Sequence, residues 1–156
     1  MTLSELLKGV EYSAIEGEAD VRVDNLTFDS RTVTSGSCFF AIEGTVSDGH
    51  NYIASAVERG ATAVICMRLP ESIETTSTTY IVTEDSEKAM ATMAATFYGN
   101  PSHKLKVVGV TGTNGKTTTK EWIAAVLGEK YVLHKTKANH NSTLGMPMSL
   151  LEMEEG

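Results

Sequence analysis

The segment that most constrains the fold of this chain is the run VVGVTGTNGKTTT at residues 107–119. Residues 105–111 are mostly apolar or β-branched and predict a buried strand, whereas residues 116–127 predict a helix. A short turn that contains glycine joins the two. A strand that enters a helix through such a turn is typical of α/β proteins that bind phosphate groups.

The turn has the residue types that a phosphate-binding loop needs. Gly112 and Gly115 allow the backbone to bend and to approach phosphate oxygens closely. The free N–H groups and the dipole at the start of the helix attract an anion. Lys116 supplies a cation for the β- and γ-phosphates, and Thr117 offers a hydroxyl to Mg²⁺.

The loop is a shortened form of the common phosphate-binding pattern. The strict pattern, Gly-x-x-x-x-Gly-Lys-Ser/Thr, requires glycine where this chain has Val110. The missing glycine and the lack of a second nucleotide motif disfavour a P-loop hydrolase or kinase. The remaining alternative is a glycine-rich turn that arose by chance, but Lys116, Thr117 and the flanking elements favour phosphate binding.

Strands and helices also alternate in the first hundred residues, which predicts an α/β fold throughout. Ser4 is expected to cap a short N-terminal helix, and Ser86 a longer one that ends near Phe97. Glycine, asparagine and proline at residues 98–102 indicate a linker. The other expected elements are strands within 20–28 and at 38–42, 63–67, 80–82 and 131–134, and a helix at 53–59.

The linker at residues 98–102 predicts two domains. Residues 1–100 are expected to form a small, complete α/β domain. Residues 101–156 are expected to form the first strand–helix–strand piece of a Rossmann-like ATPase domain.

The sulfur-containing residues are expected to belong to the core. Cys38 and Cys66 lie in apolar runs, which predicts two reduced, buried thiols, and no Cys/His spacing resembles a metal site. Met90 and Met93 recur with helical spacing, which favours a core-facing stripe over a cofactor site.

Charge and composition exclude several classes of protein. The chain has 156 residues and a formal net charge of −7, which argues against a general nucleic-acid binder. The mean hydropathy is −0.10, and no stretch approaches the roughly 20 apolar residues that a membrane span needs. The N-terminus lacks the pattern of a signal peptide, so we expect a cytoplasmic protein.

Residues 111–118 resemble the ATP-binding signature of the Mur ligases. These are ATP-dependent enzymes that form amide bonds in peptidoglycan precursor synthesis. Residues 29–31, 39–41, 48–50 and 60–64 are similar to the uridine-nucleotide domain that the MurE and MurF branches share. The resemblance therefore implies two nucleotide sites, one for a UDP-sugar and one for ATP.

The resemblance to the MurE and MurF branches differs along the chain. Residues 97–102 are MurE-like, whereas residues 120–125 are more similar to MurF. The resemblance implies that a MurE-type enzyme adds meso-diaminopimelate or L-lysine to UDP-MurNAc-L-Ala-D-Glu, and that a MurF-type enzyme adds D-Ala-D-Ala to the tripeptide. The larger MurE-like portion favours the first activity. A divergent or chimeric ligase, and an isolated uridine-nucleotide-binding module without catalysis, remain alternatives.

The resemblance also assigns roles to individual residues. In the implied reaction, the substrate carboxylate attacks the γ-phosphate of ATP, and the incoming amine attacks the acyl phosphate. Lys116 is the implied catalytic residue, because it stabilises charge on the phosphates, and Thr117 is the implied Mg²⁺ ligand. The implied ATP contacts are Gly112, Thr113, Asn114, Gly115, Lys116, Thr117 and Thr118, and those to the UDP-MurNAc-peptide are Phe28, Ser30, Thr45, Val46, Ser47, Asn139 and Asn141.

Simpler structural roles remain open for several of these positions. The simpler role of the Ser30 hydroxyl is to cap a turn, and that of Asp29 and Arg31 is to form a local ion pair. His50 follows a glycine and is compatible with merely filling a loop. Asn139 and Asn141 need no binding function, because asparagine is common in turns.

The resemblance covers nearly the whole chain but only part of a ligase. In the family, the magnesium-binding acidic residue, the carbamylated lysine and the amino-acid-selecting motif are expected beyond Gly156. The 156 residues by themselves are therefore expected to lack ligase activity. The implied partners are UDP-MurNAc-peptide and an amino acid, bound by a monomer, with no nucleic acid and no membrane span.

Overall fold

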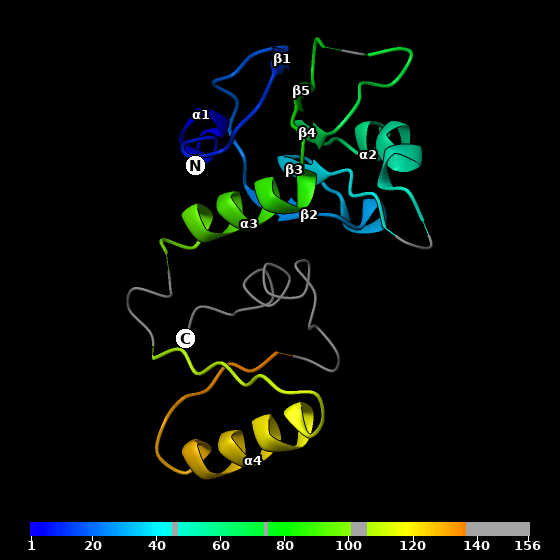
Figure 1. Cartoon of the computed structure of the whole chain (residues 1–156). Helices are drawn as coiled ribbons and strands as arrows, with labels where there is room; N and C mark the ends of the chain where they lie inside the picture. The colour runs from blue at the N-terminus through cyan, green and yellow to red at the C-terminus, as the bar shows by residue number, and fades with distance from the viewer. Residues whose placement is uncertain (45–46, 74, 101–105, 137–156) are drawn as a thin grey trace.

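Five short strands form one mixed β-sheet in the computed structural model, which describes residues 1–44, 47–73, 75–100 and 106–136 (Figure 1). The strand order is β1-β5-β4-β3-β2. Strands β2 to β5 pair in parallel, and β1 pairs antiparallel with β5. The bounds are Ala14–Glu16 for β1, Asn25–Thr27 for β2, Ser37–Phe40 for β3, Ala63–Cys66 for β4 and Thr79–Val82 for β5.

Helices cover both faces of this sheet. Helices α1 (Leu3–Leu6) and α3 (Ser86–Phe97) contribute to the core on one face, and α2 (Ile53–Glu58) to the core on the other. Successive residues of a strand point to opposite faces. Cys38 therefore packs in the first core and its neighbour Phe39 in the second, and both are fully buried.

The predicted core residues are confirmed. Cys38 and Cys66 are free, buried thiols on opposite faces of the sheet. Burial raises the pKa of the Cys66 thiol to about 11 and holds the pKa of Cys38 well above its ordinary value. Met90 and Met93 are fully buried between α3 and the sheet, as their spacing predicts.

The helix caps differ from those expected. Asp85 caps α3, because its Oδ1 accepts the Lys88 N–H at 2.9 Å. The neighbouring Ser86 hydroxyl is buried and instead donates to the Ala41 carbonyl at 3.0 Å, which ties the helix to the end of β3. Thr2, not Ser4, caps α1 through a capping box.

Two N-terminal strands also differ from expectation. The sequence does not predict β1, because three residues are too few to show an alternating pattern. The position of β1 is set by distant contacts such as the Ser13 N–H, which donates to the Val82 carbonyl at 2.8 Å. The strand expected within residues 20–28 is limited to β2, and Arg22 forms only an isolated bridge with Thr2.

Residues 106–136 contain the expected helix without the expected strands. The helix is α4, Lys116–Gly128. The segments 106–111 and 131–136 are not strands, which corrects the strands expected at 105–111 and 131–134. A strand depends on backbone hydrogen bonds to a neighbouring strand, and neither segment pairs with another strand among the described residues.

Removing the N-cap of α3 is expected to destabilise the chain. In Asp85→Ala the Lys88 N–H loses its acceptor, which lowers the free energy of unfolding by about 1 kcal/mol. Glu84→Ala is the control, because it removes an adjacent carboxylate that does not cap the helix. Urea unfolding followed by circular dichroism measures both variants, and equal stabilities would contradict the role of Asp85.

Candidate functional site

The turns that follow β2, β3 and β4 lie at one edge of the sheet. These strands are parallel, so their carboxyl ends meet at the same edge. In open α/β sheets, ligands bind at this edge. Phe28 and Ser30 follow β2, Ser47 follows β3, and Met67 follows β4. The fold thus places three of the predicted substrate residues at the edge where a ligand is expected.

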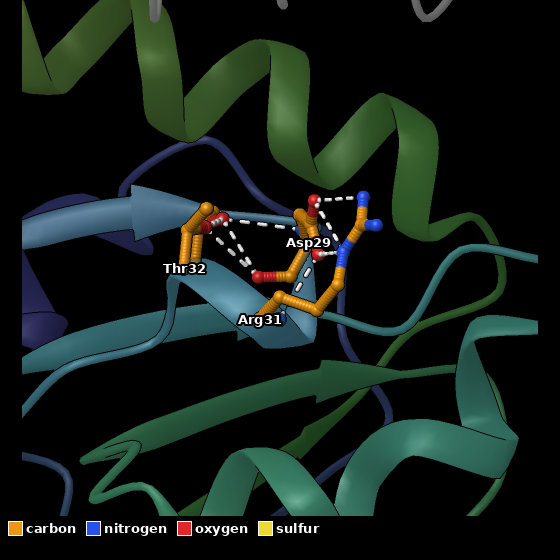
Figure 2. Close-up of polar contacts among 4 residues, drawn as sticks. Asp29, Arg31 and Thr32 are labelled. Carbon is orange, nitrogen blue, oxygen red and sulfur yellow. Dashed lines mark hydrogen bonds and ion pairs between the residues drawn. The ribbon is translucent and has the colours of Figure 1, made fainter.

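An ion pair closes the turn after β2 (Figure 2). Asp29 caps the short 3-10 helix η1, Ser30–Thr32, because its Oδ1 accepts the Arg31 backbone N–H at 2.9 Å. The Arg31 guanidinium donates to both carboxylate oxygens, with Nη2 at 2.7 Å from Oδ2. The guanidinium and backbone hydrogen bonds lower the pKa of Asp29 to about 2. The local ion pair of Asp29 and Arg31 is confirmed.

None of the contacts in this turn, among the residues that the structure describes, uses the Ser30 hydroxyl. The hydroxyls of Thr27 and Thr32 are 2.8 Å apart, and Thr32 donates to the Asp29 carbonyl at 2.9 Å, so the threonines complete the turn. The turn cap is Asp29, which makes the capping interpretation of Ser30 wrong. Within the described part of the chain, the half-buried Ser30 hydroxyl has no hydrogen-bond partner. It can therefore exchange a hydrogen bond with a ligand.

The other predicted substrate residues differ in how freely they can contact a ligand. Phe28 is half-buried and packs against the core beneath α1 and α3, so only part of its ring is accessible. Ser47 is exposed, and its Oγ donates to the Tyr52 hydroxyl at 3.2 Å. Four more predicted contacts, Thr45, Val46, Asn139 and Asn141, lie outside the described residues.

His50 connects the segment after β3 to the end of β4. It belongs to the 3-10 helix η2, Gly49–Tyr52, and its side chain is 6% exposed. Its Nδ1 lies 2.6 Å from Asp48 Oδ1, and its Nε2 accepts the Met67 backbone N–H at 3.0 Å. Asp48 also accepts the His50 backbone N–H and pairs with Arg68. His50 therefore has defined partners and does more than fill a loop.

The glycine turn before α4 is open at the helix N-terminus. Gly112 and Gly115 have φ angles of +146° and +76°, which L side chains rarely adopt. Gly115 is the N-cap of α4, and no side chain of residues 106–136 or the other described ranges caps the first turn. Residues 111–115 and 117–119 are exposed. The N–H groups at this helix end are therefore accessible to phosphate oxygens.

Polar side chains surround these N–H groups. The Lys116 ammonium donates to the Gly112 carbonyl. Thr117 and Thr118 lie in the first turn of α4, and in the described residues their hydroxyls have no hydrogen-bond partner. An ammonium and N–H groups suit phosphate oxygens, and a hydroxyl oxygen is a ligand type that Mg²⁺ accepts. The remaining predicted ATP contacts, Thr113 and Asn114, are exposed in the turn.

Comparisons with known proteins assign both parts of the chain to one family. The family model described as "Mur ligase family, catalytic domain" matches residues 22–98, and "Mur ligase middle domain" matches residues 110–156. The chain belongs to the Mur ligase family. The first match contains the turns at the sheet edge, and the second contains the glycine turn and α4 of this Mur ligase chain.

Two kinds of Mur ligase are similar to this chain. The UDP-N-acetylmuramoyl-L-alanyl-D-glutamate–2,6-diaminopimelate ligase 1 of Clostridium acetobutylicum is 46% identical over 143 residues, which are 90% of this chain and 29% of that enzyme. The 2,6-diaminopimelate ligase of Bacteroides fragilis is 51% identical over 118 residues, 76% of this chain and 24% of that enzyme. Among solved structures, MurF from Acinetobacter baumannii has a TM-score of 0.80 and 29% identity, covering 98% of this chain and 33% of that one.

The matches cover only part of each relative. The Mur ligase chain spans less than a third of the length of the curated relatives named above. Among the residues that the structure describes, no helix has the length and apolar character to cross a membrane. The same residues contain no group of three or more His, Cys, Asp or Glu side chains that could hold a metal ion.

Removing Arg31 is expected to raise the pKa of Asp29. In Arg31→Ala the carboxylate loses the guanidinium that stabilises its charged form, so its pKa should return toward 3.8 from about 2. Because the folded-state pKa is lowered, the pair stabilises the fold above the ordinary pKa, and this contribution is lost as pH falls from about 4 toward 2.

Nuclear magnetic resonance of the Asp29 carboxyl carbon, followed through an acid titration, measures this change. Arg22→Ala is the matched control, because Arg22 pairs with Asp24 and not with Asp29. An Asp29 pKa that stays near 2 in Arg31→Ala would contradict the ion pair as its cause.

Proposed function

We propose that this chain binds ATP at the glycine turn before α4 and a uridine nucleotide at the carboxyl edge of its sheet. The observation that carries the proposal is the start of α4, where Gly115 leaves the first N–H groups without a side-chain cap and Lys116 lies beside them. This arrangement offers a local anion site in a chain of net charge −7.

At the ATP site, each proposed residue has one task. Lys116 neutralises charge on the β- and γ-phosphates, and its present partner, the Gly112 carbonyl, is neutral and is given up at little cost. The N–H groups of the glycine turn and of the first helical turn hold the phosphate oxygens. Thr117 is the proposed Mg²⁺ ligand, while Thr113, Asn114 and Thr118 complete the phosphate contacts.

At the sheet edge, hydroxyl groups are the proposed contacts. The half-buried Ser30 hydroxyl has no hydrogen-bond partner in the described part of the chain, and Ser47 lies exposed on the segment after the neighbouring strand. Phe28 contributes the accessible part of its ring. The further contacts proposed on the strength of the family resemblance are Thr45, Val46, Asn139 and Asn141.

We infer that the reaction is the ATP-dependent addition of diaminopimelate to UDP-N-acetylmuramoyl-L-alanyl-D-glutamate. The curated relatives at 46% and 51% identity carry the name of that ligase. ATP supplies the phosphoryl group that activates the substrate carboxylate toward the incoming amine. The likeness to MurF structures supports addition of D-Ala-D-Ala as the second candidate.

The two parts of the chain have separate proposed roles in this reaction. Residues 1–100 hold the uridine substrate, and residues 101–156 begin the ATP-binding domain. The proposed enzyme acts as a cytoplasmic monomer. The family match and the sites described above support this division of work.

Lys116→Ala is expected to weaken ATP binding by the whole chain about tenfold or more, because it removes a charge-assisted contact to the phosphates. Lys130→Ala is the matched control, since Lys130 follows the C-terminal end of α4. Isothermal titration calorimetry with ATP and Mg²⁺ measures both. Equal affinities of the two variants would exclude Lys116 from the site, and UDP binding without ATP binding would favour a uridine-nucleotide module.

The gene product that contains this chain is expected to release phosphate from ATP when given UDP-MurNAc-L-Ala-D-Glu and meso-diaminopimelate. Ser30→Ala should raise the KM for the uridine substrate about fivefold with little change in kcat, because one ground-state hydrogen bond is lost. Ser35→Ala is the control, because its exposed hydroxyl has no partner among the described residues. Phosphate release only with the tripeptide and D-Ala-D-Ala would establish the second candidate instead.

A further inference from the structure

The segment that carries Ser47 is fixed at its base by close backbone packing. The Gly49 N–H donates to the Ile42 carbonyl at 2.7 Å, and Glu43 and Asp48 form an isolated antiparallel bridge. A Cβ atom at Gly49 would lie 2.5 Å from the Ile42 nitrogen, so a larger residue would have to displace the backbone. These contacts tie the segment to the residues that follow β3.

His50 adds a second tie, to the neighbouring strand. Its Nε2 accepts the N–H of Met67, the residue directly after β4, at 3.0 Å. Because Nε2 acts as the acceptor, the neutral ring carries its proton on Nδ1, which donates to Asp48 Oδ1 at 2.6 Å. The nearly buried imidazole thus bridges the turn after β3 and the backbone after β4.

The carboxylate that contacts the ring already has a cationic partner. The second oxygen of Asp48 pairs with Arg68, and Arg68 also lies 3.5 Å from Glu43. The contribution of His50 is therefore geometric: it offers one donor and one acceptor at a fixed separation. In the described residues, the Met67 N–H has no other hydrogen-bond partner.

We propose that His50 is a positioning residue of the uridine-nucleotide site, whose bridge to the Met67 N–H holds Ser47 at the sheet edge that also carries Ser30. This inference rests on the proposed function of that edge. The backbone contacts at the base of the segment do not involve the His50 ring. Loss of the bridge is therefore expected to reduce nucleotide affinity more than it reduces stability.

Two substitutions separate the bridge from the rest of the side chain. In His50→Gln, the longer side chain can place an amide oxygen near the position of Nε2 and accept the Met67 N–H. In His50→Asn, the shorter side chain can still donate to Asp48 but does not reach Met67. Both variants remove the imidazole and keep an amide, so they are matched in chemistry.

The experiment measures UDP binding to the whole chain by isothermal titration calorimetry, with thermal unfolding of each variant. We expect His50→Asn to weaken UDP binding about fivefold, the usual effect of one lost hydrogen bond, and His50→Gln to stay within about twofold of the wild type. Equal affinities of both variants and the wild type, or equal losses in both variants, would overturn the role of His50.

Hydrogen exchange of the wild type provides a test that does not depend on how the variants fold. UDP is expected to slow exchange of the Met67 N–H, because the ligand stabilises the bridged conformation. Unchanged exchange on UDP binding would overturn the positioning role and leave the proposed function intact. Failure of the wild type to bind UDP would overturn both proposals.

Discussion

Parallel pairing of β3 with β2 and β4 is the constraint on which the rest of the structure depends. It brings three strand ends to one edge, where the turn backbones need hydrogen-bond partners. Two adjacent turns solve this in the same way: Asp29 and Asp48 each accept, at 2.9 Å, the backbone N–H of the residue two positions later. In both turns the third residue pairs back to its own aspartate, but His50 also reaches across to Met67, the residue after β4.

The parts of the fold that the sequence predicts are those whose pattern is local. The buried runs of β3, β4 and β5 and the methionine stripe of α3 are recognisable because every core position lies within one short segment. The edge strand β1 escapes prediction, because its three residues depend on pairing with β5, more than sixty residues away. The prediction of Ser86 as the cap of α3 is wrong because Asp85, also a good capping residue, caps the helix, while the Ser86 hydroxyl donates to the Ala41 carbonyl, a contact between segments far apart in the sequence.

The residues of the candidate site also differ in whether the sequence predicts them, according to whether they lie in one continuous segment. The glycine turn and Lys116 are predictable because a phosphate site at a helix N-terminus is a continuous segment of chain. The Ser30 hydroxyl has no partner among the described residues because Thr27, Asp29 and Thr32 satisfy the polar groups of the turn. This becomes visible only when their contacts are seen together. The bridge made by His50 leaves no pattern, because Met67 contributes a backbone N–H that any residue except proline could supply.

The distribution of charge pairs favours different kinds of ligand contact at the two proposed sites. At the sheet edge, the cations Arg31 and Arg68 are already paired with carboxylates, and the Arg31 bonds lower the pKa of Asp29 to about 2. Drawing either cation toward a phosphate would leave a carboxylate without its partner, which costs free energy. Lys116 contacts only a neutral carbonyl among its described neighbours, so it can turn to a phosphate without that cost. Hydroxyl contacts to a uridine nucleotide at the edge, and triphosphate binding at α4, are therefore the division that the charges favour.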